Sequence, residues 1–232
     1  LELVMHGARL RAVERVEISV CGAGATAQRW DTRLLEPGEE LAIAPGSSGV
    51  WTYVGIRGGF GAPRWFGSVS VFPRGGLGDP LAVGAVLVRG NAPSARLEGS
   101  VGRRWVNVDE CRDYSRPPVF RVWPGPEWDL FPEAARQRFF AGPWRISARS
   151  DRTGYRLAGE PLTVQAASLP SEPVLPGSIQ VPPSGEPIIT GYDGPTVGGY
   201  PKLGLIDAEH LSWLLQCRPG QEVRFEPAVA QG

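Results

Sequence analysis

Residues 15–21 read RVEISVC and residues 50–56 read VWTYVGI, and these two stretches decide the fold class. The first alternates polar and apolar side chains, as a strand with one buried face does, and residues 41–44 show the same alternation. The second is rich in β-branched and aromatic residues, which are typical of strands. Pro37–Gly38 and Pro45–Gly46 lie between them and are typical turn sequences. The N-terminal half is therefore predicted to be a series of short strands.

The composition extends this prediction to the whole chain. The 232 residues include 31 glycines and 23 prolines, which divide the sequence into short segments. Hydrophobic residues make up 42% of the chain and include 8 tryptophans, so a core can form and the glycines and prolines mark turns. Two short helices are expected, at residues 132–140 and at residues 207–216, where Asp207 is the predicted N-cap. We predict an all-β protein with a few short helices.

The hydrophobic pattern weakens and the density of charge rises at residues 91–114, which favours a domain boundary in that stretch. We predict an N-terminal β subdomain at residues 1–100 and a second β subdomain at residues 101–232. No internal repeat of about 20 to 50 residues is visible, so the sequence does not predict a propeller or a solenoid.

The 24 basic and 24 acidic residues cancel, so the chain has no overall field that attracts nucleic acid or an anionic membrane. No apolar run approaches the roughly 20 residues of a membrane span, and the N-terminus lacks a signal-peptide pattern. We therefore expect a cytoplasmic protein that binds neither nucleic acid nor membranes. Cys21, Cys111 and Cys217 are far apart and form no CxxC motif, so they are predicted to be isolated thiols.

General catalytic signatures are absent from the sequence. It has no GxSxG nucleophile elbow, no phosphate-binding loop, no HExxH and no dinucleotide fingerprint. The two histidines, His6 and His210, lie near opposite ends of the chain, so a metal site or a triad built on imidazole is not expected. We interpret His210 as an ordinary, partly exposed residue of the second helix.

Lys202 is the only lysine among the 24 basic residues, and it ends the glycine-rich loop GGYPK at residues 198–202. An ammonium is a compact charge on a flexible stem, which suits a carboxylate or phosphate that a planar guanidinium does not fit. A ligand-binding lysine is one interpretation, and an incidental surface lysine is the other.

Two further polar features stand out. Residues 150–157 read SDRTGYRL and place Asp151 between Arg152 and Arg156 in a turn-forming stretch. One interpretation is a local ion pair that pins a hairpin, and another is a pair of arginines held by Asp151 and directed at a substrate carboxylate. Gln180 lies within an apolar strand, so its amide needs hydrogen bonds from the protein or from a ligand.

Five segments of the chain resemble, in order and spacing, the C subunit of bacterial 5-oxoprolinase, the KipA family, which is similar to the carboxyltransferase region of urea carboxylase. The segments are GIRGGFGAPRWFGSVSVFPRGGLGDPLAVGAVL (55–87), RVWPGPEWDLF (121–131), SDRTGYRLAGEPL (150–162), SEPVLPGSIQVPPSGEPII (171–189), and GGYPKLGLID with QCRPGQEVRF (198–207 and 216–225).

This resemblance implies a cyclophilin-like β-barrel, which we assign to residues 101–232. It also implies that the chain works in a complex, because this family acts with a KipI-like B subunit and a third, A-type subunit to hydrolyse 5-oxoproline to glutamate with ATP. ATP is thus the implied cofactor of the complex, although this chain carries no ATP-binding motif. The implied substrate is a small amide or carboxylate.

The candidate site combines the polar features with the resemblance. We assign catalytic roles to Lys202, Asp151 and Arg152, and substrate binding to Arg156, Gln180, Thr196, Gly198, Gly199 and Tyr200. Cationic and amide donors of this kind suit a substrate carboxylate and the oxyanion of an activated lactam.

The resemblance leaves two other functions open. One is a regulatory binding protein that antagonises a KipI-like kinase inhibitor. The other is the carboxyltransferase component of a urea or amide carboxylase. In that case biotin would arrive on another chain, because this sequence has no biotin-attachment motif.

The sequence departs from the family pattern at three places. It begins after the segment in which the family carries glutamine-aspartate and glycine-arginine motifs. Val69 stands where the family has an arginine, and Pro195 stands where it has a glutamine. The last two departures remove polar side chains from expected site positions, so they bear directly on catalytic competence.

Overall fold

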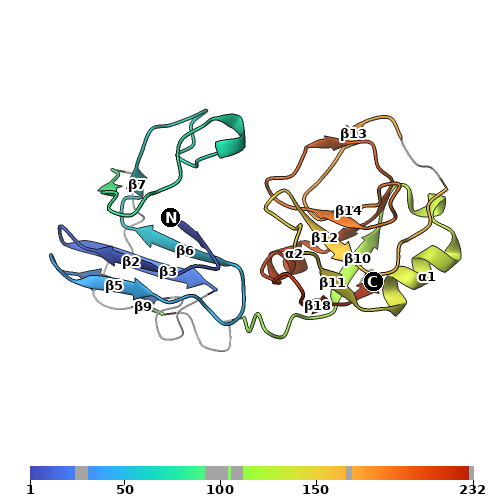
Figure 1. Cartoon of the computed structure of the whole chain (residues 1–232), viewed down its shortest axis with the longest axis horizontal. Helices are drawn as coiled ribbons and strands as arrows, with labels where there is room; N and C mark the ends of the chain where they lie inside the picture. Colours follow the sequence, from blue (N-terminus) through green and yellow to red (C-terminus); the bar gives the residue numbers. More distant parts are fainter. Residues whose placement is uncertain (24–30, 92–103, 106–111, 166–168, 230–232) are drawn as a thin grey trace. The chain divides into compact units, whose positions relative to one another are not determined.

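The computed structural model describes residues 1–23, 31–91, 104–105, 112–165 and 169–229, and the chain divides into two compact units (Figure 1). The N-terminal unit comprises Leu1–Ser47 and Trp51–Arg112, and the C-terminal unit comprises Ser48–Val50 and Asp113–Gly232. The short stretch Ser48–Val50 joins the C-terminal unit because the Val50 N–H donates to Oε1 of Gln216 at 2.7 Å.

The N-terminal unit is built on one five-stranded antiparallel sheet, in the order β1-β6-β3-β4-β9. Its strands are β1 (Glu2–Val4), β3 (Val16–Gly22), β4 (Asp31–Leu35), β6 (Trp51–Ile56) and β9 (Arg104–Trp105). Two further antiparallel pairs join β2 (Ala8–Arg11) to β5 (Glu40–Ile43) and β7 (Phe60–Gly61) to β8 (Val88–Arg89).

The core of this unit follows the alternation in the sequence. Ile18 and Val20 on β3 are buried, and they belong to one apolar cluster with Leu41 of β5 and Val54 of β6. The strands predicted from RVEISVC and VWTYVGI are confirmed.

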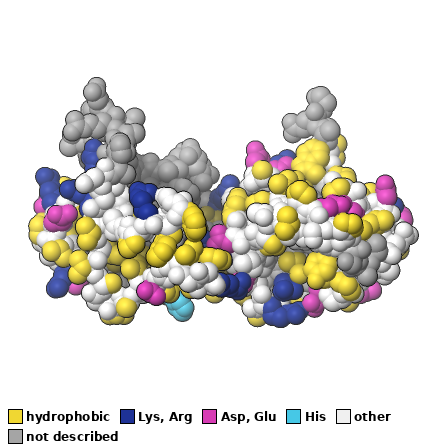
Figure 2. All heavy atoms as spheres, turned by 90° about the horizontal axis from the view of Figure 1, so that it is seen from above, with side chains coloured by type: hydrophobic (Ala, Val, Ile, Leu, Met, Phe, Trp, Pro, Cys, Tyr) yellow, Lys and Arg dark blue, Asp and Glu magenta, His cyan; other side chains and the backbone are white. Residues whose placement is uncertain are grey.

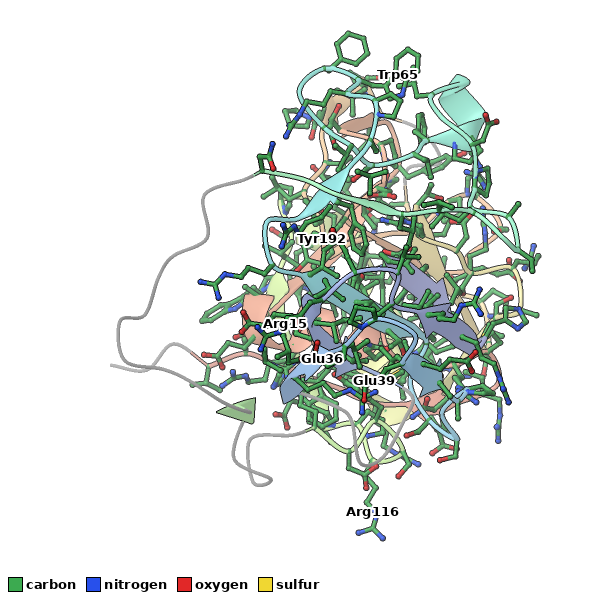
Figure 3. All side chains as sticks on the ribbon, turned by 90° about the vertical axis from the view of Figure 1, so that its left-hand side faces the viewer. Arg15, Glu36, Glu39, Trp65, Arg116 and Tyr192 are labelled. Carbon is green, nitrogen blue, oxygen red and sulfur yellow. The ribbon has the colours of Figure 1, made fainter. Side chains whose placement is uncertain are left out.

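Residues 62–87 form a long excursion between β7 and β8 that is almost entirely exposed. Trp65, which lies at the outer end of this excursion in Figure 3, exchanges two backbone hydrogen bonds of 2.8 and 2.9 Å with Ser68. The two residues between them, Phe66 and Gly67, have φ values of 51° and 84°, the positive pair of a type I′ turn. Phe66 is 98% exposed, so burial of its ring does not offset the cost of its left-handed backbone.

Exposed hydrophobic side chains are frequent on the described surface of the chain (Figure 2). In the excursion they are Trp65, Phe66, Val69, Val71, Phe72, Leu81, Val83 and Val86. No helix in the described part of the chain is both long enough and apolar enough to cross a membrane.

Replacing Phe66 with asparagine should stabilise the N-terminal unit. Phe66→Asn creates the Asn-Gly pair that type I′ turns favour, and it should raise the free energy of unfolding by about 1 kcal/mol. Val83→Asn is the control, because Val83 is fully exposed without a positive φ. Urea unfolding of both variants measures the effect, and equal stability of Phe66→Asn and the wild type would contradict it.

The C-terminal unit is built on one eight-stranded sheet in the order β18-β11-β12-β15-β14-β17-β10-β19. Its strands are β10 (Phe120–Pro124), β11 (Trp144–Ile146), β12 (Gly154–Ala158), β14 (Ser178–Gln180), β15 (Ile188–Thr190), β17 (Lys202–Ile206), β18 (Glu222–Val223) and β19 (Phe225–Pro227). The pairs are antiparallel except β10 with β19, which is parallel.

The two edge strands of this sheet, β18 and β19, are separated in the sequence by Arg224 alone. The chain therefore brings both edges together, and the sheet forms a nearly closed barrel (Figure 1). Apolar side chains with no exposed surface form the core of this unit. Phe120, Ile179, Ile189 and Leu203 come from the barrel strands, and Phe139 and Leu214 come from helices. An all-β barrel with few helices, the fold class predicted from the sequence, is confirmed.

Two helices pack on the barrel, α1 (Glu133–Ala141) and α2 (Ala208–Leu214). Asp207 is the N-cap of α2, since its Oδ1 accepts a hydrogen bond from the Glu209 N–H at 3.0 Å. Both predicted helices and the predicted cap are confirmed.

Candidate functional site

A row of four residues crosses the barrel sheet and contains three of the predicted site residues. Arg156 on β12 lies opposite Ile188 on β15, Ile188 lies opposite Gln180 on β14, and Gln180 lies opposite Lys202 on β17. Directly opposed residues of antiparallel strands project to the same face of a sheet. Arg156, Gln180 and Lys202 therefore share one face, although 46 residues separate the first from the last in sequence.

The register between β14 and β17 shifts by one residue at this row, as at a β-bulge. Ile179 lies opposite Gly204, while the next residue, Gln180, lies opposite Lys202 instead of Leu203. Leu203 points into the core with no exposed surface. The shift thus places Leu203 in the barrel and Lys202 on the outer face beside Gln180.

A two-stranded ribbon covers the Lys202 end of the row. It pairs β13 (Glu172–Pro173) with β16 (Val197–Gly198), and Glu172 lies opposite Gly198. A Cβ atom at Gly198 would lie 2.7 Å from Oε1 of Gln180, so the ribbon approaches the Gln180 amide so closely that only glycine fits without displacing it. Gln180 and Lys202 are each 6% exposed as a result.

The Lys202 ammonium is bound by two carboxylates. Its Nζ lies 3.0 Å from Oε2 of Glu172 and 3.2 Å from Oε2 of Glu127. The same Glu127 oxygen accepts the Lys202 backbone N–H at 2.9 Å. Glu127 follows a tight turn at Gly125, where a Cβ atom would overlap the Lys202 carbonyl oxygen. The turn therefore fixes Glu127 against both the backbone and the side chain of Lys202.

These contacts set the charge states of the cluster. Burial lowers the pKa of the Lys202 ammonium, but the hydrogen bonds and charges of Glu172 and Glu127 outweigh burial, and the pKa is raised overall above its ordinary 10.5. The hydrogen bond and positive charge of Lys202 in turn hold the pKa of Glu172 below its ordinary 4.5. At neutral pH the lysine is charged and Glu172 is ionised.

The Gln180 amide has a partner within the protein. Its Nε2 donates to Oγ1 of Thr190 at 3.0 Å, and both residues are buried. Thr190 lies two residues from Ile188 along β15, so its side chain is on the same face as the row. The protein therefore supplies a partner for this donor.

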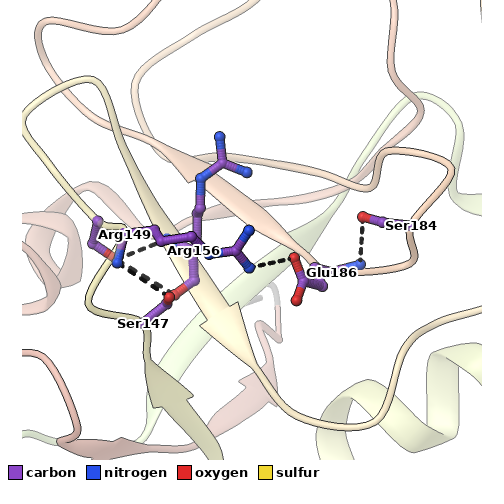
Figure 4. A network of polar contacts seen from close by, with 6 residues as sticks. Ser147, Arg149, Arg156, Ser184 and Glu186 are labelled. Atoms are coloured by element: carbon purple, nitrogen blue, oxygen red, sulfur yellow. Dashed lines mark hydrogen bonds and ion pairs between the residues drawn. The ribbon is translucent and has the colours of Figure 1, made fainter.

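Arg156 lies at the open end of the row, beyond the ribbon, and is partly exposed. The nearest acidic residue drawn in Figure 4, Glu186, is paired with Arg149 at 2.7 Å. The Arg156 backbone is fixed because its N–H donates to Oγ of Ser150 at 3.0 Å and its carbonyl accepts the Ser147 N–H at 2.9 Å. These bonds hold the main chain at Arg156, whose side chain is on the same face of the sheet as Gln180 and Lys202.

Asp151 and Arg152 lie in the turn that precedes β12 and not in the row. Asp151 Oδ1 accepts the Thr153 N–H at 2.9 Å and also the Thr153 hydroxyl, which stabilises the turn. Arg152 pairs with Asp193 at 2.6 Å. The structure therefore gives both residues contacts that hold turns together.

The remaining predicted residues lie on or beside β16. Thr196 and Gly199 accept backbone hydrogen bonds from Val174 and Leu169, respectively, at 2.9 and 2.8 Å. Thr196 is exposed, and Tyr200 is 43% exposed. These residues lie in or next to the ribbon that covers Gln180 and Lys202.

Sequence reasoning missed the two carboxylates, Glu127 and Glu172. A signal was present, since both lie inside segments that carry the family resemblance, RVWPGPEWDLF and SEPVLPGSIQVPPSGEPII. The sequence did not indicate that both acids pair with the same lysine.

His210 and Cys217 have contacts that point to structural roles. His210 accepts the Arg121 backbone N–H on Nδ1 at 2.9 Å, and burial lowers its pKa. Burial raises the pKa of the Cys217 thiol to about 12, so this cysteine is unreactive at neutral pH. Cys21 and Cys217 are free thiols, and Cys111 lies outside the described residues. Among the described residues, no group of three or more His, Cys, Asp or Glu side chains is arranged to hold a metal ion.

The fold and the row define a β-barrel protein with a polar site on the outer face of its sheet. The chain belongs to the carboxyltransferase domain, subdomain A and B, family, whose match covers residues 1–227. The resemblance inferred from the sequence is thereby confirmed.

Named relatives share most of this chain. The 5-oxoprolinase C subunit of Escherichia coli is 29% identical over 225 residues, which are 89% of this chain and 68% of that protein. The 5-oxoprolinase C subunit of Haemophilus influenzae is 34% identical over 200 residues, which are 84% of this chain and 61% of that protein. A urea amidolyase of Saccharomyces cerevisiae is 29% identical over 82% of this chain and 11% of its own length. The chain thus spans roughly two thirds of the two 5-oxoprolinase relatives.

Solved structures show the same fold. The crystal structure of TTHA0988 superposes with a TM-score of 0.81 at 31% identity, over 97% of this chain and 45% of that chain. The K. lactis urea amidolyase superposes with a TM-score of 0.78 over 98% of this chain and 15% of that chain, and at 23% identity it shows a shared fold.

Removing the Lys202 ammonium should destabilise the C-terminal unit. Lys202→Met leaves the nearly buried Glu127 without its cation, which should cost about 3 kcal/mol in the free energy of unfolding at pH 7. Because the pKa of Glu172 is lowered in the folded wild type, the stability that this ionised group contributes is present above about pH 4.5 and is lost as the pH falls further. The gap between wild type and variant should therefore narrow in acid.

Urea unfolding at a series of pH values measures this gap. Arg138→Met is the control, because Arg138 pairs with Glu160 on the exposed surface and should contribute under about 1 kcal/mol. A gap that stays constant from pH 7 to pH 3 would contradict the assigned charges.

Proposed function

We propose that this protein is a subunit of an ATP-dependent 5-oxoprolinase, a lactam hydrolase that acts with partner subunits. The observation that carries this proposal is the row that places Arg156, Gln180 and Lys202 on one face of the barrel. The two 5-oxoprolinase relatives support it, since their matches cover 84% and 89% of this chain.

The row matches the chemistry of 5-oxoproline. This substrate carries a carboxylate, a lactam carbonyl and a lactam N–H, so it needs a cation, a donor and an acceptor. Arg156 supplies a guanidinium at the open end of the row, and guanidinium groups bind carboxylates bidentately. Gln180 supplies an amide at the covered end of the row, and an amide N–H there would stabilise oxyanion character on the opening lactam.

The chain is proposed to act only within a complex. A KipI-like B subunit and a third, A-type subunit are the proposed partners. ATP is the proposed cofactor of the assembly, handled by residues outside this chain, and the cytoplasm is its proposed location. The exposed apolar excursion at residues 62–87 is consistent with a protein that binds a partner.

A second function has its own support. The family is defined by a carboxyltransferase domain, and the urea amidolyase relatives carry a similar segment. In this alternative the chain is the carboxyltransferase component of a urea or amide carboxylase, with biotin carried on another chain. Urea also presents a carbonyl and N–H groups, but it lacks the carboxylate that Arg156 would bind.

Reconstitution with the matching partner subunits tests the proposal. We expect glutamate to form from 5-oxoproline in an ATP-dependent reaction that requires this chain and does not require biotin. Biotin-dependent carboxylation of urea would support the alternative. A stable complex with neither activity would favour the regulatory binding role, in which this chain antagonises a KipI-like inhibitor.

Arg156 provides a sharper test within the active complex. Arg156→Ala should raise KM for 5-oxoproline about 10- to 100-fold with little change in kcat, because a carboxylate anchor binds substrate and transition state alike. Arg224→Ala is the control, an exposed arginine paired with Glu222 at 3.0 Å. Equal KM values for Arg156→Ala and the wild type would show that Arg156 does not bind the substrate carboxylate.

A further inference from the structure

The cluster around Lys202 presents an acidic group, not a basic one, to a ligand. Two carboxylates lie within 3.2 Å of one ammonium, so the three side chains together carry one net negative charge. The side chains of Lys202 and Glu127 are 7% and 11% exposed, whereas that of Glu172 is 43% exposed. A molecule that reaches this cluster from solvent therefore meets the Glu172 carboxylate first.

From this arrangement we propose that Glu172 accepts the amide N–H of the substrate, and that Lys202 and Glu127 are positioning residues that hold the Glu172 carboxylate in place. The inference rests on the proposed function, in which the substrate is a lactam with both a carboxylate and an N–H. It also extends to the alternative, since urea carries N–H groups.

The geometry explains why the carboxylate would be held firmly. Lys202 is tied to Glu127 twice, through Nζ at 3.2 Å and through its backbone N–H at 2.9 Å. Glu172 lies in register with Gly198, which packs closely over Gln180. The carboxylate that remains accessible is thus fixed from the barrel side by the ammonium and from the ribbon side by strand pairing.

The charge state suits an acceptor. Lys202 lowers the pKa of Glu172, and an ionised carboxylate accepts hydrogen bonds but cannot donate one. The charged groups that face Glu172 are Lys202 on β17 and Glu127 in the turn after β10. A hydrogen bond from a neutral N–H to a charged acceptor is stronger than one between neutral groups.

The two ends of the row then have complementary tasks. Arg156 and Lys202 lie three strand spacings apart, so their Cα atoms are about 14 Å apart. Because both side chains are long, the distance between their charged groups can be shorter than this. A cation at the Arg156 end and a carboxylate at the Glu172 end would orient a lactam that has its acid on one side and its N–H on the other. A substrate reversed in the site would place its carboxylate against Glu172 and be repelled.

The test compares 5-oxoproline with N-methyl-5-oxoproline, which lacks the N–H, by calorimetric binding to the assembled complex. The wild type should bind the N–H form at least 10-fold more tightly, and Glu172→Leu should bind both forms with similar affinity. Glu222→Leu is the matched control and should keep the wild-type preference. Glu222 is 42% exposed and pairs with Arg145 and Arg224, as the similarly exposed Glu172 pairs with Lys202. Glu172→Leu is chosen because its partly exposed position tolerates replacement without unfolding.

A second readout addresses Lys202. In Lys202→Met the pKa of Glu172 should rise, so the acid limb of the pH profile for kcat/KM should move to higher pH, which a purely structural lysine would not cause. The proposal is overturned if Glu172→Leu keeps the preference for the N–H form, or if Lys202→Met leaves the acid limb in place. If the wild-type complex does not bind 5-oxoproline at all, the proposed function fails, and the inference for that substrate fails with it.

Discussion

Burial of the one lysine ammonium is the constraint on which the rest of the site depends. An ammonium with only 7% of its side chain exposed is stable only if opposite charges and hydrogen bonds replace the water that it loses. Glu127 and Glu172 do this from two separate segments, and each segment must be held in place to do so. The tight turn at Gly125 holds one, and the β13–β16 ribbon holds the other. The register shift at Gln180 is what turns Lys202 toward them in the first place.

Local patterns predicted the fold class and several of its elements. β3, β5, β6, α1 and α2 lie where alternation, β-branched residues and an N-cap predicted them, because those signals act over a few residues. Gln180 and Lys202 were found as candidates because a polar group in an apolar strand and a solitary lysine are visible in the sequence alone. The contacts between segments were not predictable in this way. Glu172 and Lys202 are 30 residues apart and Glu127 and Lys202 are 75 apart, and only strand register brings them together.

Asp151 and Arg152 show that residues close in sequence can have separate contacts in the structure. Both lie within five residues of Arg156, which made a joint carboxylate-binding group plausible. In the structure the turn before β12 directs Arg152 to Asp193, and Asp151 accepts two hydrogen bonds from Thr153. Neighbours in a turn diverge, whereas Arg156 is joined to Gln180 and Lys202 by strand pairing. In an antiparallel sheet the residues that share a face are those in register, not those adjacent in the chain.

The filled barrel explains why the site is on the outside. Eight strands enclose a space that side chains alone can fill, and residues such as Ile179, Ile189 and Leu203 fill it without exposed surface. The barrel interior is therefore closed to a ligand, and the proposed site lies on the outer face of the sheet, where one layer of strands by itself would leave Gln180 and Lys202 in water. The ribbon supplies the missing second layer at one end of the row, and it leaves the Arg156 end open. In the proposed function, a site half covered in this way would exclude water from the lactam only once a substrate and a partner protein close the open end. The open Arg156 end of the row is thus compatible with the proposed action in a complex.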